Sequence, residues 1–209
     1  AARAVWLGPN GALAALAPGA LAIESSTVSP GWIAELSATV EKTGAAFIDA
    51  PVAGSRPQAE AGELAFLIGG NDPDVARFDP IARDMGRAVI HAGPVGRGIV
   101  LKMMANALLA VQTVALAELL AYGAENGLAP DRAMALLSPI PVTSPAAQAV
   151  GGLIAKGAHD PMFTIDLLVK DLRYLLDGAE APVMAEVCDS FRRAANRGHG
   201  SRHISAVAA

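Results

Sequence analysis

Lys102 and Asn106 are the two residues of this chain whose types and spacing best suit chemistry. They lie four residues apart in an apolar segment that opens with Gly96-Arg97-Gly98, and helical residues at i and i+4 share one face. A lysine is costly to bury unless it is paired or has a task. Lys102 therefore suits a general acid and base acting on a substrate oxygen, with Asn106 fixing the lysine or the substrate by hydrogen bonds. The structural alternative is a lysine that reaches solvent from a helix end and an asparagine bonded to backbone.

The glycine-rich turn before this helix strengthens the catalytic interpretation. Free N–H groups at the start of a helix attract anions such as carboxylates. Gly96-Arg97-Gly98 lacks the third glycine of a dinucleotide fingerprint, so we do not interpret it as a cofactor loop.

A second candidate segment is Asp49-Ala50-Pro51-Val52-Ala53-Gly54-Ser55-Arg56, which follows a strand-like run. Ligands of open α/β sheets bind beyond the carboxyl ends of strands. Gly54 permits close approach of the backbone to a ligand, and Ser55 or Arg56 suits a substrate carboxylate. On these residues alone, an ordinary strand-to-helix connection with a tight turn is the favoured interpretation.

Two further segments carry weaker signals. In Ser26-Thr27-Val28-Ser29, Ser29 is the expected helix N-cap, whereas Thr27 at the strand end is placed to touch a cofactor. In Lys170-Asp171, adjacent helical residues point in different directions, so only one can face a site, and a solvated charged pair is the simpler interpretation. The four histidines lie far apart without metal-ligand spacing, so we expect no metal site.

The elements that must position these residues change character near residue 93. Before it, strand-like and helix-like runs alternate; after it, only helical patterns follow, the first of them closed by Gly127 as C-cap. Expected strands are 21–25, 45–50, 64–68 and 88–91; expected helices are 30–43, 72–85, 98–126, 131–137, 144–156, 164–176 and 182–196. The chain also opens as if inside a helix. We therefore predict an α/β, partly parallel domain over 1–93, followed by an all-α domain with one long helix over 94–209.

Composition excludes several function classes. The net charge is −4 without a basic block and aromatic residues make up 4%, which opposes nucleic-acid binding. We expect no apolar run to approach the roughly 20 residues that span a bilayer, and so no membrane partner. The single cysteine, Cys188, excludes an internal disulfide and favours a reducing compartment, hence a cytoplasmic protein.

Taken in order, these segments resemble the 3-hydroxyisobutyrate dehydrogenase family of β-hydroxyacid dehydrogenases, within the 6-phosphogluconate dehydrogenase-like superfamily. The resemblance covers essentially the whole chain, including Ile204-Ser205-Ala206-Val207 near its end. It implies a Rossmann-like domain, hydride transfer between NAD or NADP and a small hydroxy acid or aldehyde acid, and a homodimer or homotetramer packed through the long helix. By resemblance, Lys102 is the catalytic residue. The implied substrate-binding residues are Ala53, Gly54, Ser55 and Asn106, and the implied cofactor-binding residues are Thr27 and Lys170.

The sequence departs from the family pattern at two places. Ala53 stands where the family usually has a serine, which puts the identity of the substrate in doubt. The family's first strand and glycine-rich turn, which cradle the pyrophosphate and read the ribose, find no counterpart in these residues, so NAD and NADP are not distinguished. The alternatives are therefore a truncated, non-catalytic fragment that only folds and oligomerises, or a relative of the imine reductases.

Overall fold

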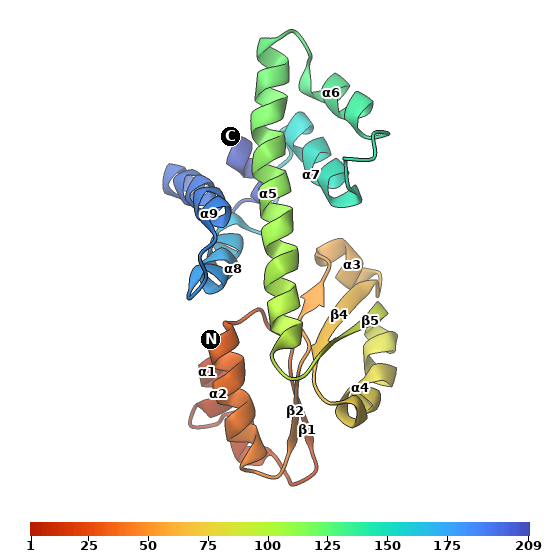
Figure 1. Cartoon of the computed structure of the whole chain (residues 1–209), viewed down its shortest axis with the longest axis vertical. Coiled ribbons are helices and arrows are strands. Elements are labelled where there is room, and N and C mark those ends of the chain that lie inside the picture. Colours follow the sequence, from red (N-terminus) through yellow and green to blue (C-terminus); the bar gives the residue numbers. More distant parts are fainter. The chain divides into compact units, whose positions relative to one another are not determined.

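The computed structural model describes residues 1–209, which form two compact units, Ala1–Met104 and Ala105–Ala209. One helix, α5 (Arg97–Glu125), begins in the first unit and continues into the second (Figure 1). It is the long helix that the sequence predicts, and the α/β region followed by helices confirms the expected fold class.

The first unit alternates helices and strands. Its strands are β1 (Leu21–Glu24), β2 (Ala46–Asp49), β3 (Val52–Ala53), β4 (Leu64–Gly69) and β5 (Gly86–Gly93). Its helices are α1 (Ala2–Leu7), the 3-10 turn η1 (Ala12–Ala15), α2 (Pro30–Glu41), α3 (Arg56–Glu60) and α4 (Asp72–Met85). The expected strands and helices of this unit are all present, and α4 has the bounds that its sequence predicts.

The five strands form one mixed sheet. β1 pairs in parallel with β2, and β4 pairs in parallel with β5. β2 and β3 both pair antiparallel with β4, Asp49 opposite Gly69 and Ala53 opposite Ala65, so β3 continues the register of β2 beyond Pro51. The predicted partly parallel pairing is confirmed. The segment that the sequence suggested as a loop instead begins as a paired strand.

Alternation along the strands places side chains on both faces of this sheet, and Figure 1 shows α2 and α4 on its two sides. On the α4 side, Ile48, Phe66 and Ile68 pack against Val75 and Phe78. The rings of Phe66 and Phe78 meet edge to face, with centroids 5.4 Å apart. The apolar residues by which these strands were predicted are therefore buried because they pack against helices.

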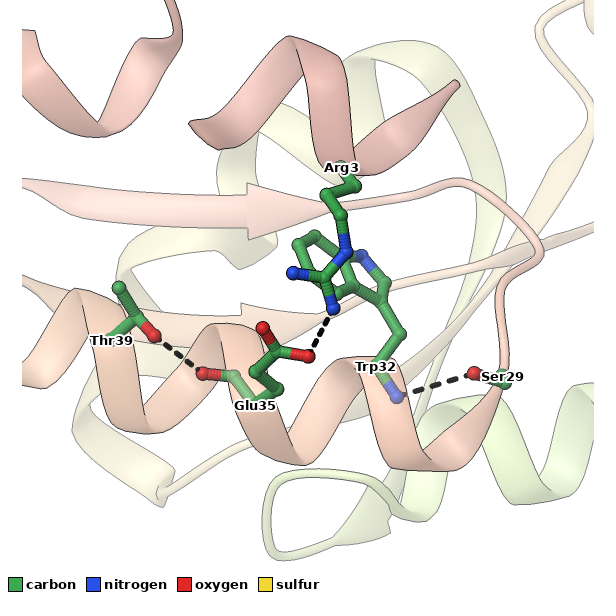
Figure 2. Close-up of polar contacts among 5 residues, drawn as sticks. All are labelled: Arg3, Ser29, Trp32, Glu35 and Thr39. Carbon is green, nitrogen blue, oxygen red and sulfur yellow. Dashed lines mark hydrogen bonds and ion pairs between the residues drawn. The ribbon is translucent and has the colours of Figure 1, made fainter. Parts of the chain in front are cut away.

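The N-terminal helix α1 is attached to α2 by a polar contact. The guanidinium of Arg3 lies 4.6 Å from the ring centroid of Trp32 and forms an ion pair with Glu35 (Figure 2). Ser29 caps α2, as its sequence predicts, because its hydroxyl accepts the N–H of Trp32 at 3.2 Å. The opening residues are thus part of the folded first unit.

The second unit is helical. Besides the remainder of α5 it contains α6 (Pro130–Leu137), α7 (Pro145–Lys156), α8 (Ile165–Leu176), α9 (Pro182–Ala194), the π turn η2 (Ala195–His199) and the 3-10 turn η3 (Ile204–Ala208). The α9 helix ends two residues before the predicted Asn196, and the chain continues as the π turn η2, in which Gly198 has a φ of +92°.

Two clusters of apolar side chains hold this unit together. One joins Ala107 and Ala110 of α5 to Leu168, Phe191 and neighbours on α8, α9 and η3. The other joins Leu116 and Leu120 to Met134 and Ala147 of α6 and α7. In Figure 1, α8 and α9 lie on one side of this part of α5, and α6 and α7 on the other.

Gly127 ends α5 as predicted. Its φ is +81°, its N–H donates to the carbonyl of Ala124, and the N–H of Leu128 donates to that of Gly123. This pair of bonds satisfies two carbonyls that a helix end leaves without partners.

The membrane expectation requires a correction concerning α5. At 29 residues and a mean hydropathy of 1.8 in its most apolar window, α5 is long and apolar enough to cross a bilayer by length and composition. The sequence expectation missed this because Lys102 and Asn106 interrupt the apolar run. In the structure, 44% of that window is buried within the protein. The small residues Ala107 and Ala110 in the cluster with α8 and α9 are those of a helix in a protein core.

Candidate active site

The start of α5 is held by a buried carboxylate from the sheet. Asp49, the last residue of β2, accepts the N–H of Gly96 at 2.6 Å and the N–H of Ile99 at 2.7 Å. Asp49 is completely buried, and this burial raises the pKa of its carboxyl while the backbone N–H donors lower it. The helix start does attract a carboxylate, as its sequence predicts, but the carboxylate is the protein's own Asp49.

Glycines allow α5 to meet the sheet so closely. A Cβ on Gly98 would lie 2.3 Å from the carbonyl oxygen of Leu67, and a Cβ on Gly69 would lie 2.3 Å from Oδ1 of Asp49. Gly96 has a φ of +88°, which other residues rarely adopt. The glycine-rich turn noted in the sequence thus joins helix to sheet.

Lys102 and Asn106 follow on the helix that this joint anchors. Both are buried, with 9% and 5% of their surfaces exposed, and their spacing places them on one face of α5. The alternative in which Lys102 reaches solvent does not describe a side chain buried to this degree. The two polar residues are therefore buried in a largely apolar helix.

Asn106 is bonded to a residue that sequence reasoning did not select. Its Nδ2 donates to Oδ2 of Asp171 on α8 at 2.7 Å, and Asp171 is only 2% exposed. Nζ of Lys170 lies 2.7 Å from Oδ1 of the same carboxylate as an ion pair, without hydrogen-bond geometry. The interpretation of Lys170-Asp171 as a solvated charged pair is wrong, because Asp171 is buried and shared by Asn106 and Lys170.

The signal for Asp171 was present but ambiguous. Lys170 and Asp171 are neighbours on α8, and such a pair is usually exposed to solvent. What marks Asp171 as a buried acid is its hydrogen bond to Asn106, 65 positions away in the sequence. A buried carboxylate must be compensated, and here Asn106 supplies a hydrogen bond and Lys170 a positive charge.

Lys170 also lines a recess of about 450 Å³ on the second unit. Its ammonium lies 4.9 Å from the ring centroid of Tyr174, and Arg173, Arg192 and Asn196 form other parts of the wall. Arg192 is paired with Asp189 at 2.8 Å. Cations predominate around this recess, with Asp166 as the acidic exception, so its chemistry suits an anionic or polar ligand.

The predicted substrate segment lies at the turn from β3 into α3. Ala53 is half-buried in β3, and Gly54 has a φ of +123° with Gln58 and Leu64 too close to admit a Cβ. Ser55 is bonded to Gln58: its N–H and its hydroxyl both donate to Oε1, at 2.9 and 3.0 Å. Arg56 is exposed and paired with Glu60 at 2.7 Å. The Ser55 hydroxyl and the Arg56 guanidinium, which the sequence suggested for a substrate carboxylate, thus both have partners within α3.

Thr27 lies in the connection from β1 to α2 and is half-buried. Because Glu24 pairs in register with Asp49, β1 and β2 end side by side. Glu24 is buried and accepts the N–H of Ser26 at 2.8 Å and Nε1 of Trp6 at 2.7 Å, which fixes the turn before Thr27. The structure therefore brings the Thr27 turn, Asp49 and the start of α5 to one edge of the sheet, where doubly wound proteins bind ligands.

Comparisons with known proteins identify the family of this chain. Residues 1–93 match the model of the NAD binding domain of 6-phosphogluconate dehydrogenase, and residues 96–209 that of the NAD-binding domain of NADP-dependent 3-hydroxyisobutyrate dehydrogenase. The NAD-dependent L-serine dehydrogenase of Pseudomonas aeruginosa is 31% identical over 97% of this chain and 72% of its own length. The mitochondrial 3-hydroxyisobutyrate dehydrogenase of Mus musculus is 30% identical over 97% of this chain, which spans 64% of that relative.

Solved structures give the same result. The 3-hydroxyisobutyrate dehydrogenase of Mycobacterium tuberculosis, solved with L-serine, matches with a TM-score of 0.85 at 30% identity, over 94% of this chain and 71% of that one. An imine reductase from a Pseudomonas species matches at 16% identity with a TM-score of 0.55, which shows a shared fold alone. The chain belongs to the 3-hydroxyisobutyrate dehydrogenase-like family of NAD(P)-dependent hydroxyacid dehydrogenases.

Proposed function

We propose that this protein transfers hydride between NAD or NADP and a small hydroxy acid or the matching aldehyde acid, with Lys102 as its general acid and base. The observation that carries the proposal is the buried pair Lys102 and Asn106 on one face of α5, with Asn106 held by Asp171. An asparagine fixed through Nδ2 keeps its Oδ1 available to a substrate hydroxyl.

The substrate carboxylate is assigned to the segment Ala53-Gly54-Ser55. β3 holds Ala53 in register with the sheet, and Gly54, with a φ of +123°, turns the chain directly after it. Because Ser55 is already bonded to Gln58, the backbone of this segment is the first group we assign to the carboxylate.

Thr27 and Lys170 are the residues proposed to contact the cofactor. Thr27 stands at the carboxyl end of β1, where such folds bind dinucleotides, and Lys170 stands in the cationic recess, which suits the negative charge of NAD and NADP. When bound, the nicotinamide ring accepts or donates the hydride.

The proton accompanies the hydride in a balanced step. In oxidation, Lys102 in its neutral form would take the hydroxyl proton, and NAD or NADP, when bound, would supply the acceptor for the hydride of the carbinol carbon. The carbon–oxygen bond becomes a carbonyl. In reduction, the Lys102 ammonium returns the proton to the developing alkoxide, and Asn106 orients the oxygen in both directions.

Self-association is proposed from one face of α5. Met104, Leu108, Leu119 and Tyr122 are each more than half exposed and recur at the spacing of a single helical stripe. A contiguous apolar stripe of this kind suits packing against a second copy of the chain.

Replacing Lys102 by alanine in the full-length protein tests the mechanism. We expect kcat to fall at least about a hundredfold with L-serine or 3-hydroxyisobutyrate, the typical loss when a general acid or base is removed, while binding of NAD or NADP by calorimetry is retained. Lys42→Ala, at an exposed position after α2, is the matched control and should be unchanged. Turnover of Lys102→Ala within twofold of the parent would contradict the proposal.

A panel of substrates separates the alternatives. A cyclic imine reduced in preference to any aldehyde acid would replace the hydroxy-acid assignment by imine reduction, although an ammonium at Lys102 suits an alkoxide better than a cationic substrate. Binding of neither NAD nor NADP, with folding and self-association intact, would support the non-catalytic alternative.

A further inference from the structure

The carboxylate of Asp49 is the point at which the predicted substrate segment and the predicted catalytic helix are joined. Both of its oxygens are used, Oδ1 by the N–H of Gly96 and Oδ2 by the N–H of Ile99, and the side chain is fully buried. A carboxylate at a helix N-terminus also interacts favourably with the helix dipole. These two hydrogen bonds satisfy the carboxylate without a ligand. Asp49 therefore has a structural role, which is to hold the start of α5 next to the candidate site.

The contact between Asp49 and the start of α5, here called the joint, fixes the position of Lys102. Ile99 lies three residues before Lys102 on the same continuous helix, a rise of about 4.5 Å along the axis at ~1.5 Å per residue. Gly98 packs against the carbonyl oxygen of Leu67, with no room for a Cβ. The start of α5 therefore has little freedom to shift along the sheet.

The position of Ala53, four residues after Asp49, is fixed relative to the same joint. The chain between them is tied to the sheet at each step: the N–H of Ala50 donates to Glu24 and the carbonyl of Pro51 accepts from Leu67, both at 2.8 Å. Ala53 itself pairs with Ala65 of β4. The segment assigned to the substrate carboxylate is thus held at a fixed position relative to Asp49.

We propose that Asp49 is a positioning residue that sets the separation between the carboxylate-binding segment and Lys102, and so selects the length of the hydroxy acid. The proposal rests on the proposed function, because it takes Ala53-Gly54-Ser55 as the carboxylate site and Lys102 as the group at the hydroxyl. A substrate with one methylene more or fewer places its hydroxyl away from Lys102 when the joint is rigid. A variant that weakens the contact between Asp49 and α5 should therefore accept acids of more than one length.

Asp49→Asn in the full-length protein tests this with a series of unbranched acids: glycolate, 3-hydroxypropionate and 4-hydroxybutyrate. Asparagine has the same shape but only one oxygen, so its amide group faces one N–H donor without a bond. We expect kcat/KM for the preferred length to fall about tenfold or more. We further expect the ratio between the preferred and the next-best length to shrink at least about fivefold, with the KM for the cofactor unchanged. Amide exchange at Gly96 and Ile99 should rise.

Gly98→Ala is the second variant, since it disturbs the same joint while keeping the Asp49 charge. It should likewise reduce the ratio of kcat/KM between the preferred and the next-best length. Ile33→Ala, in the buried face of α2, is the control for general destabilisation. Any loss of kcat/KM in this control should be the same factor for all three acids, so that the ratios between them do not change. Where Asp49→Asn does not fold, the result with Gly98→Ala decides.

The outcomes separate this inference from the function on which it rests. If Lys102→Ala is inactive but Asp49→Asn and Gly98→Ala keep the parent ratios between acids, Asp49 has no role in selecting length. If Lys102→Ala keeps its activity, the proposed function itself fails. A uniform loss across the three acids assigns Asp49 to stability alone.

Discussion

The amide of Asn106 and the carboxylate of Asp171 form a buried hydrogen bond of 2.7 Å that links α5 to α8 within the second unit. Because Asp171 also pairs with Lys170, one carboxylate orients both the residue proposed to hold the substrate oxygen and the residue proposed to contact the cofactor. We therefore expect Asp171 to position Asn106 and Lys170, a role that the Lys170-Asp171 motif alone did not indicate.

Asp171→Ala should destabilise the second unit and impair turnover. The variant leaves the buried Nδ2 of Asn106 without an acceptor, which costs about 1–3 kcal/mol of unfolding free energy. A misoriented Asn106 should also lower kcat/KM for the hydroxy acid about tenfold. Urea unfolding and steady-state kinetics measure the two effects.

Asp171→Asn separates the two partners of the carboxylate, because it still offers an oxygen to Asn106 but removes the charge beside Lys170. We expect most of the kcat to be kept while the KM for NAD or NADP rises severalfold. Asp177→Asn, an exposed acid at the end of α8, controls for the loss of one charge. Equal effects of Asp171→Asn and Asp171→Ala on the cofactor and on the hydroxy acid would contradict separate roles for the two contacts.

Ala53→Ser should strengthen substrate binding. A hydroxyl at this position adds one hydrogen bond to a carboxylate, and bonds to charged groups contribute about 1.5–3 kcal/mol. We expect the KM for the hydroxy acid to fall roughly tenfold, with the KM for the cofactor unchanged. Ala59→Ser, on the exposed surface of α3, adds a hydroxyl away from the segment and should have no effect. An unchanged KM in Ala53→Ser would remove Ala53 from the carboxylate site.

Local signals in the sequence predict the elements, and the structure confirms them where those signals act over short range. The Ser29 cap, the bounds of α4 and the Gly127 end of α5 each depend on residues within a few positions of one another. Intrinsic preference and turn chemistry are sufficient for such features.

Contacts between distant residues could not be predicted in the same way. The N–H groups at the start of α5 have an obvious need for an acceptor, but nothing local identifies Asp49, 47 positions earlier, as that acceptor. The same holds for Asp171 and Asn106. Likewise, Val52 and Ala53 become a strand only because β4 pairs with them, a tertiary effect that a small-residue run does not reveal.

Leu108→Glu should weaken self-association of the protein. Leu108 is one of the exposed apolar residues of the α5 stripe, and a glutamate buried there in a helix-to-helix interface would lack a partner. We expect the dissociation constant of the assembly to rise at least about tenfold by sedimentation equilibrium. Val183→Glu, an equally exposed apolar position on α9, should leave assembly unchanged. If Leu108→Glu assembles like the parent, the interface lies elsewhere.

Acid should loosen the C-terminal turn η3 through two histidines that share Ser205. Nδ1 of His159 and Nδ1 of His203 each lie 2.9 Å from the Ser205 hydroxyl, and Nδ1 of His203 also accepts the N–H of Ser205 at 3.1 Å. The accepted bond places the His203 proton on Nε2, so protonation of Nδ1 removes the cap of η3. Burial lowers the pKa of both imidazoles. Electrostatic interactions with Arg202 and His199 lower the pKa of His159 further, and an interaction with His159 does so for His203.

The sign of the pH dependence follows from these lowered pKa values. Below the ordinary histidine pKa of about 6.5 the unfolded chain binds protons that the folded chain resists, so stability is complete above that pH and is lost as the pH falls toward the folded-state pKa. We expect backbone amides of residues 204–208 to exchange faster at pH 5.5 than at pH 7.5, after correction for the intrinsic rate. His203→Asn keeps an oxygen that accepts the N–H of Ser205 but does not titrate, so this variant should lose much of the pH dependence while retaining the turn. His91→Asn, in the first unit, should behave like the parent at these amides, and an unchanged pH response in His203→Asn would show that the loosening arises from other groups.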